Sequence, residues 1–178
     1  WSSDVCSSDL IRGEVETAQA FSSLPFDHLL FTGSTQVGRH VMRAAAENLT
    51  PVTLELGGKS PCIISDDFPM DDACERIGFG KVLNCGQTCV APDYILCPRQ
   101  RVDEFIEAWK AKIEQLYPTI RDNPDYTSVI NERQYERLQA VLQDAKDKGA
   151  RVIEINPANE DLAGTRKMPH TLVLDVTD

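Results

Sequence analysis

The segment Leu29-Leu30-Phe31-Thr32-Gly33-Ser34-Thr35-Gln36-Val37-Gly38 joins a short apolar run to the start of an amphipathic stretch. The run at 27–31 is typical of a short buried strand, and Ser34 or Thr35 can cap a helix that extends to about Asn48. A second apolar strand follows at 52–56 and ends at a glycine pair. Strand, helix and strand with a tight glycine turn predict a parallel β-α-β unit, and therefore an α/β fold.

The rest of the chain continues this alternation. Apolar spacing predicts helices at 14–21, 70–83, 102–116 and 132–148, and strands at 62–65, 94–97, 152–155 and 171–176. Loops are expected at 84–92, 117–125 and 157–170. The residues expected on buried helix faces are Val37, Val41, Ala44 and Ala45 in the helix after the glycine turn, and Phe105, Ile106, Trp109 and Ile113 in helix 102–116.

Composition excludes several classes of protein. The 178 residues are 42% hydrophobic, which is a globular composition, and the net charge is −10. A chain this acidic gains nothing from counterion release, so we exclude nucleic acid as a partner and disfavour an anionic membrane surface. No apolar run reaches membrane-spanning length, and no secretory signal is recognisable. We expect a cytoplasmic protein whose six cysteines are reduced: Cys6, Cys62, Cys74, Cys85, Cys89 and Cys97.

The first ten residues differ from the rest of the chain. Residues 1–10 repeat Ser-Ser-Asp twice, with no period that would bury an apolar face. We interpret them as a non-native leader or translation artefact and exclude them from the fold. The alternative is an ordinary disordered terminus.

The glycine turn at 33–38 is a candidate anion site. Backbone N–H groups at a helix N-terminus bind anions, and the helix dipole adds to the attraction. Gly33 permits a close approach of a phosphate to the backbone, Ser34 can donate a hydrogen bond to it, and Gly38 allows close packing of helix on strand. A plain strand-to-helix turn with a capped helix explains the same residues equally well.

Glu55 is a carboxylate within an apolar strand, just before Gly57-Gly58-Lys59. Burial would raise its pKa toward the range of a general base, and the carboxyl end of a strand is where open α/β sheets bind ligands. Alternatively, Glu55 points outward or pairs with Lys59, and the alternation of faces along a strand somewhat favours this second interpretation.

Cys89 lies in the polar loop Asn84-Cys-Gly-Gln-Thr-Cys-Val-Ala-Pro92. A nucleophilic thiol must be reachable, and backbone N–H groups near it can stabilise an oxyanion. A metal site at Cys85 and Cys89 is disfavoured because no further ligands complete it. The three histidines are scattered, so we interpret each as a surface or packing residue, and the other cysteines from Cys62 onward as small buried residues.

Taken together, three motifs closely resemble the aldehyde dehydrogenase superfamily. They are Phe31-Thr-Gly-Ser-Thr-x-x-Gly38, Leu54-Glu-Leu-Gly-Gly-Lys-Ser-Pro61 and Gly86-Gln-Thr-Cys89, in this order and at this spacing. The resemblance extends from Ile11 to Asp178. The variant Gly86-Gln-Thr-Cys-Val-Ala-Pro-Asp-Tyr94 resembles the branch that acts on coniferyl aldehyde and on fatty or aromatic aldehydes.

The resemblance implies oxidation of an aldehyde to its acid with NAD or NADP. Cys89 would be the nucleophile that forms a thioester, its N–H would be half of an oxyanion hole, and Glu55 would activate the hydrolytic water. Glu55 also favours hydrolysis over acylation of coenzyme A. The residues implied in cofactor binding are Gly33, Ser34, Thr35, Val37, Gly38, Leu56 and Gly57; no metal is implied.

Members of this superfamily are several hundred residues long, so we expect an internal fragment. Residues 11–57 would be the end of a Rossmann-like cofactor domain, and residues 58–178 the start of the α/β catalytic domain. The complete protein would be a homo-oligomer, and the fragment alone would be inactive. Two alternatives stay open: a thiol-redox protein that uses Cys85 and Cys89, and a non-catalytic interaction module.

Overall fold

The computed structural model describes residues 10–177 and confirms the α/β class. The chain divides into two compact units, Trp1–Gly57 and Gly58–Asp178. The interpretation of residues 1–10 lies almost entirely outside the described residues. The assignment of the two units to a cofactor domain and a catalytic domain stays a prediction.

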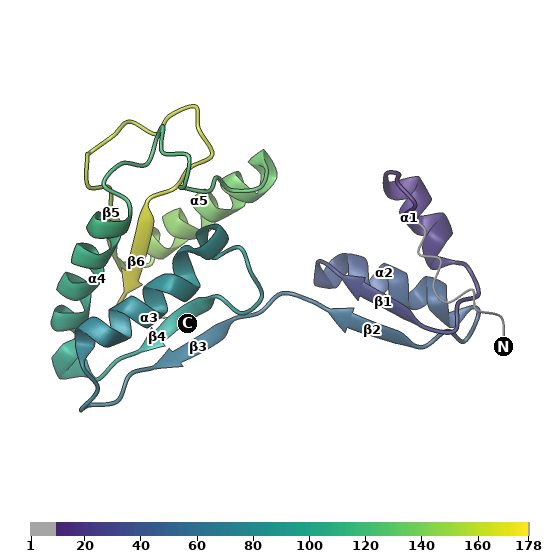
Figure 1. The fold of residues 1–178 in the computed structure, drawn as a ribbon, viewed down its shortest axis with the longest axis horizontal. Helices are drawn as coiled ribbons and strands as arrows, with labels where there is room; N and C mark the ends of the chain where they lie inside the picture. The colour runs from purple at the N-terminus through teal and green to yellow at the C-terminus, as the bar shows by residue number, and fades with distance from the viewer. Residues whose placement is uncertain (1–9, 178) are drawn as a thin grey trace, which may run out of the picture. The chain divides into compact units, whose positions relative to one another are not determined.

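The first unit contains the predicted parallel β-α-β arrangement (Figure 1). Its elements are α1 (Val15–Ser22), β1 (Leu29–Thr32), α2 (Thr35–Ala46) and β2 (Val52–Glu55). β1 pairs with β2 in parallel, so that Leu29 lies opposite Val52 and Thr32 opposite Glu55. This register brings the carboxyl ends of both strands to the edge at which α2 begins.

The packing of α2 confirms most of its predicted buried face. Val41 and Ala45 are buried and Ala44 is half-buried, but Val37 is 48% exposed, so its predicted burial is wrong. In the first turn of α2 it is the neighbouring Gly38 that is buried against the strands, so Val37 does not continue the buried face formed by Val41 and Ala45.

The second unit begins with β3 (Ser60–Ile63), α3 (Met70–Val82), a 3₁₀ turn (Leu83–Gly86) and β4 (Pro92–Leu96). A short 3₁₀ turn (Arg99–Arg101) leads into α4 (Val102–Leu116), which is followed by α5 (Glu132–Asp147), β5 (Arg151–Ile155) and β6 (His170–Leu174). β3 and β4 are parallel, β5 and β6 antiparallel. Helices α3 and α4 pack against each other (Figure 1).

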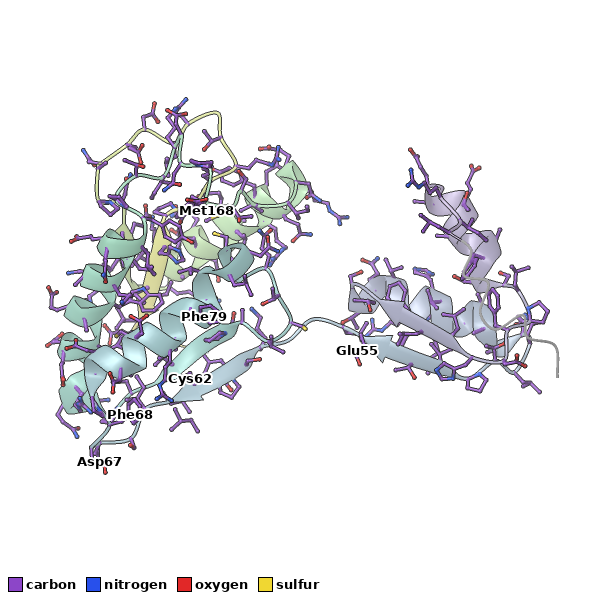
Figure 2. The ribbon with its side chains drawn as sticks, viewed as in Figure 1. Glu55, Cys62, Asp67, Phe68, Phe79 and Met168 are labelled. Carbon is purple, nitrogen blue, oxygen red and sulfur yellow. The ribbon has the colours of Figure 1, made fainter. Side chains whose placement is uncertain are left out.

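One hydrophobic core holds the second unit together. Its buried members come from α3, α4 and the neighbouring strands: Ile64, Met70, Ala73, Cys74, Ile77, Phe105, Trp109, Ile113 and Ile155. All four residues predicted on the buried face of α4 belong to the buried set, and the bounds of this helix match the predicted 102–116. By contrast Phe79, on the opposite side of α3, is 76% exposed (Figure 2).

Strand β3 begins two residues earlier than predicted. It spans Ser60–Ile63 because Ser60 pairs with Pro92 at the start of β4, across an irregularity between Ser60 and Pro61. Pro61 contributes no N–H to the hydrogen bonds between strands, so the sequence predicts that the strand starts after it, at Cys62. Within residues 10–177, no helix is both long and apolar enough to cross a membrane.

Candidate active site

The turn between β1 and α2 has the geometry of a capped helix start. Ser34 has extended backbone angles, and its hydroxyl accepts a hydrogen bond from the N–H of Val37 at 3.3 Å. The N–H of Gly33 donates to the carbonyl of Glu55 at 3.0 Å, which ties the turn to the end of β2. The first turn of α2 contains no acidic residue. Its N-terminus therefore presents N–H groups and hydroxyls with no carboxylate of its own first turn to compete for them.

The residues predicted to bind a cofactor fall into two groups. Gly33, Ser34, Thr35 and Val37 are exposed at this turn. Gly38 is instead buried, and a Cβ atom there would lie 3.1 Å from Leu56 Cδ2, so Gly38 and Leu56 hold the helix close to the strand. Gly57 is exposed and has open space around its Cα.

Glu55 lies at the carboxyl end of β2 (Figure 2). Its side chain is exposed in this chain, which agrees with the outward orientation that the alternation of strand faces favours over burial. Strand residues alternate faces, and Glu55 follows the outward positions of β2 while Val52 and Leu54 are half-buried. Its alternative partner Lys59 forms an ion pair with Asp93 at 3.1 Å. Glu55 belongs to the first unit and Cys89 to the second.

The loop that contains Cys89 leaves α3 through an unusual backbone. Asn84, Cys85 and Gly86 all have positive φ angles, of 51°, 54° and 73°. Such conformations are uncommon for residues other than glycine and cost free energy unless the surroundings hold them. The three successive residues with positive φ angles reverse the direction of the chain after α3. Cys89, which follows three residues later, is exposed.

The main chain at Cys89 is fixed by the segment that precedes β3. A Cβ atom at Gly58 would overlap the carbonyl oxygen of Cys89 and lie 3.2 Å from its carbonyl carbon, so only glycine fits there. The hydroxyl of Ser60 donates to the same carbonyl oxygen at 3.4 Å. Gly58 and Ser60 therefore support the loop of Cys89 at the carbonyl of that residue.

The other cysteines of the described chain are less accessible than Cys89. Cys74 is buried, and burial raises the pKa of its thiol to about 11. Cys62, Cys85 and Cys97 are half-buried, and burial raises the pKa of each thiol. At Cys85 the hydroxyl of Tyr126 and the charge of Lys81 partly oppose that rise. A raised thiol pKa lowers the fraction of reactive thiolate at neutral pH.

The histidines behave as packing or surface residues, as predicted. His170 is buried among Trp109, Tyr117 and Tyr126, and stacks on Tyr117 with ring centroids 6.0 Å apart. His28 is exposed and hydrogen-bonds to the hydroxyl of Thr53, and His40 is exposed. In the part of the chain that the structure describes, no group of three His, Cys, Asp or Glu residues is placed to hold a metal ion.

Comparison with known proteins identifies the family. A model described as "Aldehyde dehydrogenase family" matches residues 9–178. This chain belongs to the aldehyde dehydrogenase family. It is 59% identical over 169 residues to a probable coniferyl aldehyde dehydrogenase of Pseudomonas aeruginosa, a match that covers 95% of this chain and 35% of the relative. The predicted resemblance to the family and to this branch is thereby confirmed.

Solved aldehyde dehydrogenase structures share the fold. The substrate-bound AldH of Staphylococcus aureus has a TM-score of 0.82 and 40% identity, over 94% of this chain and 35% of that one. An aldehyde dehydrogenase of Mycobacterium tuberculosis complexed with NAD⁺ has a TM-score of 0.79 and 36% identity, over 93% of this chain and 35% of that one. The chain thus spans about a third of the length of these relatives.

Sequence reasoning missed two supports of the candidate nucleophile within this aldehyde dehydrogenase segment. The sequence indicates Gly58 only as the end of a strand; a glycine there can also mark a close backbone approach, but nothing in the sequence identifies Cys89 as the partner. The side chain of Gln87 contacts residues far along the chain, and no periodicity reveals such contacts.

Proposed function

We propose that the complete protein containing this chain oxidises an aldehyde to its carboxylic acid with NAD or NADP, and that Cys89 is the nucleophile. One observation carries this proposal: among the cysteines of residues 10–177, Cys89 alone is exposed, on a loop whose main chain is fixed. Membership of the aldehyde dehydrogenase family supports the reaction class.

In the proposed reaction, the thiolate of Cys89 forms a bond to the carbonyl carbon of the aldehyde. The developing oxyanion accepts a hydrogen bond from the N–H of Cys89, a donor whose position is held because Gly58 and Ser60 fix the adjacent carbonyl. NAD or NADP, when bound, would supply the hydride acceptor, so that loss of a hydride from this carbon would leave a thioester on Cys89. Because Cys85 is half-buried with a raised thiol pKa, a redox reaction of Cys85 with Cys89 is disfavoured.

Glu55 is proposed to complete turnover. As a carboxylate it would accept a proton from water while the water oxygen attacks the thioester carbon. The carbon–sulfur bond then breaks, the thiolate of Cys89 is restored and the carboxylic acid leaves. Glu55 is exposed at a strand end, so it is reachable by water.

The turn at the start of α2 fits a diphosphate. Exposed N–H and hydroxyl groups at Ser34 and Thr35 provide donors, Gly33 leaves room for a phosphate close to the backbone, and the first turn of α2 contains no acidic residue that would oppose the positive end of the helix dipole. Gly38 and Leu56 would hold this turn in place, and Val37 and Gly57 would border it. The structure complexed with NAD⁺ is 36% identical to this chain, which supports NAD or NADP as the cofactor.

The relative named for coniferyl aldehyde supports an aromatic aldehyde as substrate. A panel of aromatic and aliphatic aldehydes, assayed with the complete enzyme, tests this choice. We further propose that the complete enzyme is a cytoplasmic homo-oligomer.

The test of the nucleophile uses the complete enzyme with Cys89→Ala, and Cys97→Ala as the matched control. Cys89→Ala should abolish aldehyde-dependent formation of the reduced nicotinamide, whereas Cys97→Ala should retain it. Glu55→Gln should give a burst of hydride transfer followed by slow steady-state turnover, because acylation proceeds and deacylation does not. Activity in Cys89→Ala, or loss of the burst in Glu55→Gln, would contradict the respective role.

A further inference from the structure

We propose that Gln87 is a positioning residue, which fixes the loop of Cys89 by binding main-chain groups of the distant segment 128–130. This inference rests on the proposed role of Cys89 as nucleophile. Gln87 lies two residues before Cys89 and is half-buried. Its side-chain amide is oriented toward residues that lie some forty positions later in the chain.

The amide of Gln87 is fully used. Its Oε1 accepts a hydrogen bond from the N–H of Ile130 at 3.0 Å. Its Nε2 donates to the carbonyl of Ser128 at 3.1 Å and to the carbonyl of Asn84 at 3.1 Å. The amide therefore pairs with the carbonyl of one residue and the N–H of the second residue after it, as the backbone of a neighbouring strand would.

The segment 128–130 is itself anchored on its other side. Val129 exchanges two hydrogen bonds with Arg166, since its N–H donates to the Arg166 carbonyl at 2.9 Å and its carbonyl accepts from Nε of Arg166 at 2.9 Å. Directly after the segment, the side chain of Asn131 caps α5 by accepting from the N–H of Gln134. Gln87 thus attaches the Cys89 loop to a segment that Arg166 binds and that leads directly into the capped start of α5.

The loop needs such a support because its backbone is strained. The positive φ angles of Asn84, Cys85 and Gly86 precede Gln87 directly, and conformations of this kind persist only when their surroundings determine them. Gln87 satisfies the carbonyl of Asn84 within this strained turn and anchors the turn to Ser128 and Ile130. Gly58 and Ser60 hold the other end of the loop, at the carbonyl of Cys89. The thiol therefore lies between two fixed points.

The chemistry of the contact requires glutamine at this position. A glutamate carboxylate would accept from Ile130 but would place negative charge against the carbonyls of Ser128 and Asn84. Protonation of that glutamate restores one donor. Leucine matches the size of glutamine but leaves one N–H and two carbonyls without this partner. These two substitutions separate hydrogen bonding from packing.

The experiment compares the complete enzyme with its Gln87→Leu, Gln87→Glu and Gln100→Leu variants. Gln100 is the matched control because its exposed amide donates to the carboxylate of Asp66, and neither residue belongs to the loop 84–92. For each enzyme, kcat and KM are measured, and the alkylation of Cys89 and Cys74 by iodoacetamide is followed by mass spectrometry. Cys74 is 1% exposed, so its labelling reports general unfolding.

We expect kcat to fall about tenfold to a hundredfold in Gln87→Leu, because a small misplacement of a reacting group costs this much, with little change in KM. Cys89 alkylation should change while Cys74 stays protected. In Gln87→Glu, both kcat and Cys89 alkylation, taken relative to the unsubstituted enzyme, should recover as the pH is lowered. Gln100→Leu should resemble the unsubstituted enzyme.

A kcat within twofold of the unsubstituted enzyme in Gln87→Leu would overturn the proposal, as would a loss matched by labelling of Cys74, which would show a general role in stability. A Gln87→Glu variant without pH-dependent recovery would also contradict it. Failure of the proposed function is distinguishable, because activity would then survive in Cys89→Ala, whatever the result at Gln87.

Discussion

At the scale of single residues, the described contacts of Cys89 fall on its main-chain carbonyl. Gly58 lies against this carbonyl and Ser60 donates to it, while the thiol itself is exposed. A nucleophile needs a free side chain and a fixed backbone, because the oxyanion donor beside it is a main-chain N–H. The two requirements are met by different atoms of the same residue.

Gly58→Ala should displace Cys89, since the added methyl group overlaps backbone atoms that cannot rotate away. We expect unfolding to become easier by about 1–3 kcal/mol, the usual range for overpacking, and kcat to fall. Thermal unfolding and steady-state kinetics of the complete enzyme measure both effects. Gly57→Ala is the matched control for stability, because a Cβ atom there meets nothing within 4 Å. Equal stability losses at both positions would refute the close approach.

The residue scale also shows how far the sequence leads. Residue types alone make Cys89 a plausible nucleophile and leave Glu55 open, whereas the order of three motifs resembling the aldehyde dehydrogenases implies the roles of both residues, which stay predictions. The support from Gly58 and Gln87 depends on contacts with residues about thirty to forty positions away, which only the folded chain defines. The exposure of Glu55, by contrast, follows from the alternation of faces along β2, which the sequence already indicates.

At the scale of elements, the start of α2 combines structural and binding roles. The hydroxyl of Ser34 caps the helix by accepting from Val37 N–H, and the hydrogen of the same hydroxyl stays available for a phosphate oxygen. Stability of α2 and affinity for a diphosphate can therefore be separated by substitution at this one position.

Ser34→Ala should lower the free energy of unfolding by about 1 kcal/mol, the usual contribution of such a cap, and weaken cofactor binding. Ser34→Asp retains a capping oxygen, so it should preserve stability, but its charge should repel a diphosphate and weaken binding further. Thermal unfolding and titration of the complete enzyme with NAD or NADP check the two effects. Cofactor affinity unchanged in Ser34→Asp would remove this turn from the proposed binding site.

The elements differ in how far their sequences define them. Helix α4 was predicted with its observed bounds, because Phe105, Ile106, Trp109 and Ile113 repeat at helical spacing and all four are buried. The predicted bounds of β3 lie two residues too late, because the start of this strand depends on the pairing of Ser60 with Pro92. Periodicity within one segment identifies a helix, whereas the ends of a strand are defined by its neighbour.

At the scale of the whole molecule, one buried histidine makes a defined contribution to the pH dependence of stability. His28 and His40 are exposed, whereas His170 is buried in the second unit against Trp109, Tyr117 and Tyr126. Burial first, and then the charge of Lys81, lower the pKa of His170 from 6.5 to about 4. The neighbouring phenols of Tyr117 and Tyr126 have raised pKa values and stay neutral, so they offer no compensating negative charge.

A lowered histidine pKa makes the folded state less stable in acid. Above pH 6.5 His170 is neutral in both the folded and the unfolded chain, so it does not make the free energy of unfolding depend on pH. As the pH falls from 6.5 toward 4, the unfolded chain takes up a proton that the folded chain does not, so stability decreases. Over this window the loss is about 3 kcal/mol, since one pKa unit corresponds to about 1.4 kcal/mol.

His170→Phe tests this prediction, because it keeps an aromatic ring in the cluster and removes the titrating group. In the 178-residue chain with Trp1→Phe, Trp109 is the only tryptophan, and its ring lies 6.3 Å from that of His170, so its fluorescence reports unfolding of this cluster. Carboxylates titrate in both proteins, so the difference between their urea-unfolding curves isolates His170. The difference in free energy of unfolding between the two proteins should grow as the pH falls from 6.5 to 4. A difference that stays constant over this range would show that His170 is already hydrated or charged in the folded chain.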